Sequence, residues 1–300
     1  MARPNGSPAR GRAWPSGERF TLTGPSITLD PRNHAARRDI ADVALAGVLF
    51  APHYAAPEIM TCGTSATMIR SHGNHGAVAL SQLLPGEAFA LLDVDDGWAW
   101  GYGLHDRYVG HVPLAALGAR IEPTHRIVVP TALIFSAPDI KAPATATLPF
   151  SAGVDGVQAG DFIQTDNGFI HRRHVAPIDT RLDDLVATAR DLIGLPYLWG
   201  GRGGGGIDCS GLVQVSLAMA GIPAPRDSDQ QRDALGTAID PADPLQRGDL
   251  VFFPGHVGMM VDGGMMVHAN AHWMRVTEEP LADVLARLAM PAPAAVRRIG

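Results

Sequence analysis

Tyr197 to Ser210 reads YLWGGRGGGGIDCS, and this stretch decides the fold of the second half of the chain. The glycine run ends at Asp208, Cys209 follows at once, and an apolar segment then continues until it stops before Gly221. This order predicts a loop, an N-cap at Asp208 and a helix that begins at Cys209. The first turn of a helix carries the positive end of the helix dipole, which favours a thiolate there. The pattern therefore predicts a cysteine nucleophile at Cys209.

Two histidines downstream are candidates for the general base that such a thiol needs. His256 begins the segment HVGMMV, and His268 lies in MMVHANA, after the turn Asp262-Gly263-Gly264. If this turn is a three-residue loop, both histidines lie on one face of a hairpin as diagonal neighbours, whereas a two-residue loop places them on opposite faces. One histidine would take the proton of Cys209 and the other would orient it, but spacing alone does not decide which does which.

The spacing of apolar residues changes twice along the chain. From about residue 48 to 117, short apolar segments such as AFALLDV and WAWGYG alternate with turns, and a weaker copy follows from 124 to 177. Each copy predicts a small β-barrel. At Thr180 the apolar period becomes 3.6, with Thr180 and Asp183 as the expected helix cap, and strand-like segments follow, which predicts an α+β domain with an antiparallel sheet. We therefore expect a flexible N-terminal segment at 1–38, a first β-barrel with a leading helix at 39–120, a second β-barrel at 121–178 and the α+β domain at 179–300.

The composition argues against several classes of partner. The formal net charge of the 300 residues is −6, so we expect no nucleic-acid partner. No apolar run reaches the roughly 18 residues of a membrane span and no apolar signal region follows the N-terminus, so we expect a cytoplasmic protein without a membrane partner. The two cysteines, Cys62 and Cys209, lie in unlike surroundings. This predicts no disulfide framework and a structural thiol at Cys62.

Other patterns that could bind a metal or a cofactor are weak. The pairs His72/His75 and His171/His174 have a spacing that a metal could use, but no further ligands accompany them. The motif Gly201-x-Gly203-x-x-Gly206 lacks the preceding strand of a dinucleotide site. We therefore expect neither a metal nor a cofactor, and we interpret the glycine run as a flexible approach to Asp208.

Four ordered motifs resemble those of a known family. GLPYLWGGRGGGGIDCSGLVQ, PRDSDQQ, RGDLVFF and HVGMMVDGGMMVHA, between about residues 182 and 269, are similar to the NlpC/P60 family of cysteine peptidases, which cleave peptidoglycan stem peptides. The preceding modules resemble bacterial SH3-like domains. The resemblance implies a papain-like fold with Cys209 as nucleophile, His256 as base and His268 as third polar residue. It further implies a substrate site lined by Tyr197, Asp208, Ser210 and Ser228.

The combination of modules resembles the γ-D-glutamyl-L-diamino acid endopeptidases. It implies cleavage of the γ-D-Glu to meso-diaminopimelate bond in L-Ala-γ-D-Glu-diaminopimelate peptides during murein peptide recycling, with the first SH3-like module reading the free amine of L-Ala. Asp106, Tyr102 and Tyr108 are the candidates for that contact. A non-catalytic cell-wall-binding protein and a papain-like amidase or acyltransferase are the alternatives. The sequence does not indicate an oligomeric state.

Overall fold

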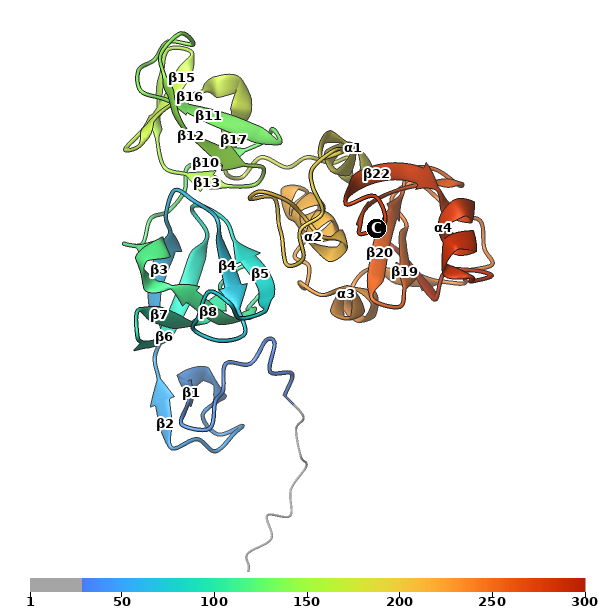
Figure 1. The fold of residues 1–300 in the computed structure, drawn as a ribbon, viewed down its shortest axis with the longest axis horizontal. Helices are drawn as coiled ribbons and strands as arrows, with labels where there is room; N and C mark the ends of the chain where they lie inside the picture. The colour runs from blue at the N-terminus through green and yellow to red at the C-terminus, as the bar shows by residue number, and fades with distance from the viewer. Residues whose placement is uncertain (1–28, 300) are drawn as a thin grey trace, which may run out of the picture.

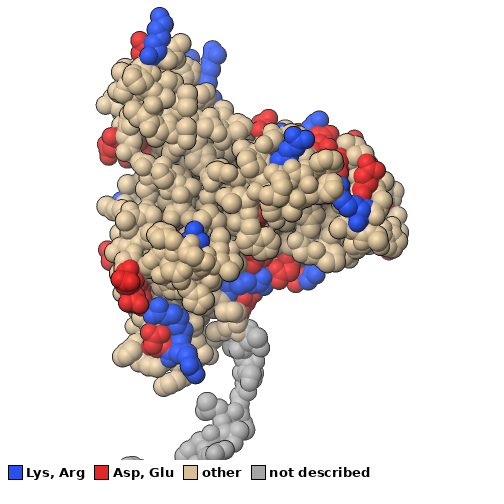
Figure 2. Space-filling view, viewed as in Figure 1, with Lys and Arg blue, Asp and Glu red and all other residues tan. Residues whose placement is uncertain are grey.

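The computed structural model describes residues 29–299, and the predictions made for residues 1–28 lie outside this part of the chain. Two β-rich domains lie one above the other, and a domain with four α-helices lies beside them (Figure 1). Acidic and basic side chains are spread in small mixed groups on the face drawn in Figure 2, and one such group lies along the lower edge of the C-terminal domain. None of the described helices is long and apolar enough to span a membrane.

The predicted leading helix over residues 39–49 is not present. Strand β1 (Ile40–Asp42) instead pairs in parallel with β2 (His53–Ala55), and a single 3-10 turn follows β1. The reason lies in Asp42, whose carboxylate accepts the amide of Ala44 and, at 2.8 Å, the phenol of Tyr102. These bonds hold the segment against the first β-domain in a turn rather than a helix. Within the segment expected to be flexible, Arg32 contacts both the first β-domain, at Val109, and the C-terminal domain, at Asp227, while the flexibility itself stays a prediction.

The first β-domain is a seven-stranded antiparallel sheet. Its strand order is β5-β4-β8-β7-β6-β3-β9. Asp96 and Gly97 form the turn between β6 and β7, and both have positive φ. An Asp-Gly pair is typical of such a two-residue hairpin turn. Ile69, Phe89 and Val112 are fully buried in its core. The strands are β3 (Glu58–Cys62), β4 (Thr67–Arg70), β5 (Ala79–Leu83), β6 (Ala88–Asp95), β7 (Trp98–Gly103), β8 (Val109–Pro113) and β9 (Leu117–Gly118), with a 3-10 turn at Leu114–Ala116.

The second β-domain has its own core around Ile134, Leu148 and Ile170. Its strands form a five-stranded sheet, β12-β11-β16-β15-β14, and a three-stranded sheet, β13-β10-β17. The β content agrees with the sequence, while the SH3-like character of this second domain stays a prediction. The strands are β10 (His125–Ile127), β11 (Thr131–Phe135), β12 (Ala144–Pro149), β13 (Gly153–Val154), β14 (Val157–Ala159), β15 (Phe162–Thr165), β16 (Gly168–His171) and β17 (Val175–Pro177), with a 3-10 turn at Arg172–His174.

The C-terminal domain has the predicted order of helices first and antiparallel sheet after. Its strand order is β18-β23-β19-β20-β21-β22, and nearly all of α2 is buried against this sheet. Asp184 caps α1, not Thr180 or Asp183, so α1 begins later than predicted. The elements are α1 (Leu185–Asp191), α2 (Cys209–Met219), α3 (Ser228–Ala234), β18 (Thr237–Ile239), β19 (Leu250–Phe253), β20 (His256–Met260), β21 (Met265–Asn270), β22 (Arg275–Pro280), α4 (Leu281–Leu288) and β23 (Ala295–Arg298).

Candidate active site

Helix α2 packs against the sheet face that carries Val257 and Val267, with Cys209 in its first turn, whereas His256 and His268 alternate onto the face that carries Met260 and Met266. Asp208 is its N-cap, as predicted, with Oδ1 accepting the amide of Gly211 at 2.7 Å. Cys209 is the first helical residue and is 7% exposed. The backbone amides of Ser210 and Val257 face its sulfur, and Val257 directly follows His256 on β20. The start of α2 and the start of β20 therefore meet at the thiol.

The histidine pair has the register that a three-residue turn requires. Met260 pairs with Met266 across the β20–β21 hairpin, so His256 and His268 lie on one face. His256 Nε2 is 2.8 Å from His268 Nδ1. On its other side, His268 Nε2 is 2.7 Å from Oε1 of Glu279, a residue of β22 that the sequence analysis did not identify.

Glu279 sets which nitrogens carry protons. Burial raises the pKa of its carboxyl, but hydrogen bonds from Arg287 and His268 outweigh this and hold the pKa below its ordinary value. An ionised carboxylate only accepts hydrogen bonds, so His268 donates from Nε2 and its Nδ1 accepts from His256 Nε2. Asn270 Nδ2 also lies 3.0 Å from His268 Nε2, and since both would be donors, the charge-assisted contact with Glu279 is the hydrogen bond. The assignment leaves His256 Nδ1 without a proton. This order of contacts is compatible with His256 as the base and His268 as the orienting group, roles that stay predictions.

Burial shifts the pKa values of the thiol and of the His256 imidazole in the directions that favour their neutral forms. Burial, reinforced by the charge of Asp208, raises the pKa of Cys209 to about 11, although the Ser210 and Val257 amides act in the opposite direction. Burial, reinforced by the neighbouring His268 and Arg287, lowers the pKa of His256 to about 3. The amides at the helix start favour the thiolate, as expected, but burial acts more strongly on the pKa of Cys209. A neutral imidazole is the form that can accept the proton of Cys209.

A pocket of about 250 Å³ opens beside Cys209. Tyr197, Asp208, Ser210 and Ser228, the predicted substrate residues, all line it together with Leu80, Tyr108, Trp199, Cys209, Asp227, Asp229 and Gly255. Leu80 and Tyr108 belong to the first β-domain, so the pocket is shared between domains. Tyr102 and Asp106 do not line it. Tyr102 is bonded to Asp42, and the fully buried carboxylate of Asp106 accepts from Gln214 at 2.9 Å.

Arg226 is a buried arginine that links several residues of this site by hydrogen bonds. It lies inside the motif PRDSDQQ, but the sequence did not lead us to predict its role. It is 1% exposed and donates to both oxygens of Asp208, at 2.9 and 2.7 Å. It also donates to Ser210 Oγ at 2.9 Å and to Ser81 Oγ of the first β-domain at 3.0 Å. The carboxylate of Asp208 is thus occupied by protein donors, and it holds the loop and the helix start rather than offering free oxygens to a ligand.

The glycine run is docked against the first β-domain. Gln82 Oε1 accepts the amides of Arg202 and Gly204, each at 3.0 Å, and Gln82 Nε2 donates to the Gly204 carbonyl at 2.7 Å. A Cβ at Gly204 would lie 2.3 Å from the Cβ of Ala66. The interpretation of the run as a flexible approach is therefore wrong, since glycine is needed here for close packing between domains.

Comparison with known proteins identifies two regions of the chain that match protein families. Residues 194–286 match the NlpC/P60 family, and residues 69–117 match the bacterial dipeptidyl-peptidase SH3 domain. A gamma-D-glutamyl-L-lysine dipeptidyl-peptidase of Bacillus cereus is 41% identical over 95 residues, which are 29% of this chain and 28% of that protein. Its namesake from Bacillus subtilis is 36% identical over 112 residues, 34% of this chain and 37% of that protein. The matched region thus spans about a third of these relatives.

The fold is also found among solved structures. An NlpC/P60 family protein from Bacillus cereus superimposes with a TM-score of 0.66 at 23% identity, over 80% of this chain and 99% of that chain. This likeness concerns the fold. Together with the matched sequence regions, it shows that the chain contains an NlpC/P60 domain, the domain of a family of cysteine peptidases, preceded by a bacterial dipeptidyl-peptidase SH3 domain.

Proposed function

We propose that this protein is a cysteine peptidase that hydrolyses the γ-D-glutamyl bond to a diamino acid, meso-diaminopimelate in the first instance, in murein peptides with a free N-terminal L-Ala. The observation that carries the proposal is the chain of contacts from His256 through His268 to Glu279, together with a pocket-lining thiol, Cys209, whose sulfur faces the amide of the residue after His256. The names of the two Bacillus relatives support the class of bond.

The chemistry needs two steps. Cys209 Sγ attacks the γ-carbonyl carbon while its proton passes to His256 Nδ1, and the proton then goes to the leaving amine as the C–N bond breaks. Water hydrolyses the resulting thioester with His256 again as base. Burial, with Cys209 and Asp208 nearby, raises the pKa of Tyr197 to about 12, so its phenol stays protonated. Tyr197 and the amides at the start of α2 are the candidate donors to the oxyanion.

The free amine has a matching acidic wall. Asp227, Asp229 and Tyr108 line the pocket on the side of the first β-domain. Burial and the charge of Asp227 raise the pKa of Tyr108, so this phenol also keeps its proton and donates to Asp227. A carboxylate pair of this kind favours an ammonium group. A free L-Ala amine exists only on peptides already released from the glycan, which supports our proposal of a role in the recycling of trimmed peptides in the cytoplasm.

Three peptides test the proposal. L-Ala-γ-D-Glu-diaminopimelate should be cleaved to L-Ala-γ-D-Glu and diaminopimelate, its N-acetylated form should be cleaved far more slowly, and the L-lysine analogue reports the preferred diamino acid. Cys209→Ala should abolish turnover while the protein remains folded. Absence of cleavage of all three peptides would contradict the peptidase, and equal cleavage of the free and acetylated peptides would contradict only the recognition of the amine.

A further inference from the structure

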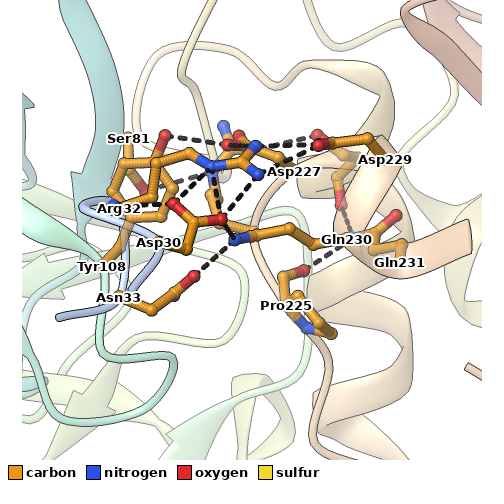
Figure 3. Close-up of polar contacts among 12 residues, drawn as sticks. Asp30, Arg32, Asn33, Ser81, Tyr108, Pro225, Asp227, Asp229, Gln230 and Gln231 are labelled. Carbon is orange, nitrogen blue, oxygen red and sulfur yellow. Dashed lines mark hydrogen bonds and ion pairs between the residues drawn. The ribbon is translucent and has the colours of Figure 1, made fainter. Parts of the chain in front are cut away.

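The N-terminal segment reaches the acidic wall of the pocket. Residues 30–34 form a turn in which the amides of Asn33 and His34 donate to the carbonyl of Asp30, at 3.1 and 3.0 Å. The Arg32 carbonyl accepts the amide of Val109 at 2.8 Å, and Asn33 Nδ2 donates to the Asp106 carbonyl at 3.2 Å. The turn is thus fastened to the first β-domain and presents the Arg32 side chain to the C-terminal domain (Figure 3).

The guanidinium of Arg32 joins the two carboxylates of the pocket wall (Figure 3). Its Nη1 donates to Asp227 Oδ2 and to Asp229 Oδ1, each at 2.9 Å, and its Nη2 donates to Asp229 Oδ2 at 3.0 Å. Arg32 Nη2 also donates to Asp30 Oδ2 at 2.7 Å, so a third carboxylate contacts the same guanidinium. Planar guanidinium groups suit such multiple contacts with carboxylates better than an ammonium group does.

Asp227 is left with one oxygen for a ligand. Its Oδ2 accepts from both Arg32 and the Tyr108 phenol, the latter at 3.0 Å. Among residues 29–299 no hydrogen-bond donor is assigned to Oδ1. Asp227 and Asp229 line the pocket, whereas Arg32 does not. The guanidinium therefore lies behind the carboxylates and does not occupy the pocket itself.

The charge of the cluster stays negative with Arg32 present. Three carboxylates, on Asp30, Asp227 and Asp229, face one guanidinium, which leaves a formal charge of about −2. Without Arg32, the carboxylates of Asp227 and Asp229 would repel each other at the mouth of the pocket. Arg32 thus holds like charges together without cancelling the attraction for a cation.

We propose that Arg32 is a positioning residue for the ammonium group of the substrate, and that the turn at residues 30–34 is part of the substrate site. Arg32 binds Asp227 and Asp229 from outside and orients Asp227 so that Oδ1 is free to accept from the ammonium. This inference rests on the proposed function and deepens it, because it assigns amine recognition to a segment outside both matched domains.

Arg32→Gln and Arg32→Lys in the full chain test the inference through KM and kcat for the free-amine peptide and its acetylated form. Since Arg32 acts on the ammonium group only through Asp227, Arg32→Gln should raise KM for the free-amine peptide about tenfold, which corresponds to about 1.4 kcal/mol. Its kcat should change by less than about twofold, and Arg32→Lys should lie between, since it keeps the charge without the planar contacts.

Arg37→Gln is the matched control, because Arg37 lies on the same segment but pairs with Asp39 and Asp93 away from the pocket. Its KM should stay at the wild-type value. An unchanged KM in Arg32→Gln, an equal loss for both peptides, or a gain in kcat/KM would each overturn the inference, the last by showing that the guanidinium competes with the substrate. Failure of the proposed function is seen separately in the wild-type arm, as no cleavage or no preference for the free amine, and it would overturn this inference with it.

Discussion

Glu279 is the residue that fixes the protons on both histidines. Its hydrogen bond of 2.7 Å to His268 leaves Nδ1 of His256 without a proton, as the proposed base requires, and its charge acts to raise the pKa of His256. Glu279→Gln keeps the shape but loses the charge, so we expect kcat/KM to fall about 10- to 100-fold, the equivalent of about 1.5–3 kcal/mol. The acidic limb of the pH profile of kcat/KM should move to lower pH, because the imidazole of His256 loses a stabilising anion.

Glu278→Gln is the control for this variant, since Glu278 is the next residue on β22 and pairs with Arg190 at 2.8 Å. Its pH profile should match that of the wild type. A Glu279→Gln enzyme with an unshifted acidic limb would show that the carboxylate only supports the fold.

The candidate catalytic residues could be predicted from the sequence only where local order sufficed, and their roles stay predictions. Cys209, His256 and His268 could be predicted from a helix start and a hairpin turn, both of which are local features. Glu279 could not, because the segment RVTEEP has the composition of an exposed edge strand. Its burial follows from pairing of β22 with β21 and from the ion pair with Arg287 at the end of α4. Contacts of this kind depend on tertiary structure that local pattern does not encode.

At the scale of elements, the glycine loop and the N-terminal segment were predicted wrongly for a common reason. Glycine in sequence indicates freedom of the backbone, but Gly204 is required by the approach of Ala66 from another domain. Likewise, the helical spacing in residues 39–49 is overridden by Asp42, which is 1% exposed because Tyr102, 60 residues away, binds it. The long apolar elements, α2 and the β20–β21 hairpin, were predicted well because their own patterns determine them.

The docking of this loop can be tested with one methyl group. Gly204→Ala introduces a Cβ 2.3 Å from that of Ala66, so we expect the free energy of unfolding to fall by about 1–3 kcal/mol and KM to rise as the pocket wall moves. Gly118→Ala is the control, because nothing lies within 4 Å of its added Cβ. Chemical denaturation and peptide kinetics measure the two effects, and equal behaviour of the two variants would argue that the loop is free to shift.

At the scale of the whole molecule, buried charges join the C-terminal domain to the first β-domain. Arg202, 2% exposed, binds Glu87 at 2.6 Å across the interface. Burial acts to raise the pKa of Glu87, but the charges of Arg202 and His105 outweigh burial, so this pKa is lowered. The same opposing effects lower the pKa of Asp106. The interface that closes the substrate pocket is therefore held by carboxylates that must stay ionised.

This interface predicts how stability depends on pH. A carboxyl whose folded pKa is lowered stabilises the fold above its ordinary pKa, and that stability is lost as the pH falls toward the folded value. His256, with a folded pKa of about 3, acts in the same direction from about pH 6.5 downward, because only the unfolded state then binds its proton. The free energy of unfolding should therefore decline gently below about pH 6.5 and steeply below about pH 4.

Glu87→Gln separates the contribution of the interface carboxyls to the pH dependence of stability from that of the histidines. It leaves Arg202 buried without its anion, which should cost about 3 kcal/mol at pH 7. The decline below about pH 4 should be shallower than in the wild type, since one of the titrating carboxyls is gone, while the decline near pH 6 should be unchanged because the histidines remain. Glu122→Gln, in an exposed pair with Arg120, should reproduce the wild-type curve. Denaturant unfolding at several pH values measures all three proteins, and parallel curves for wild type and Glu87→Gln would exclude Glu87 from the acid-sensitive interface.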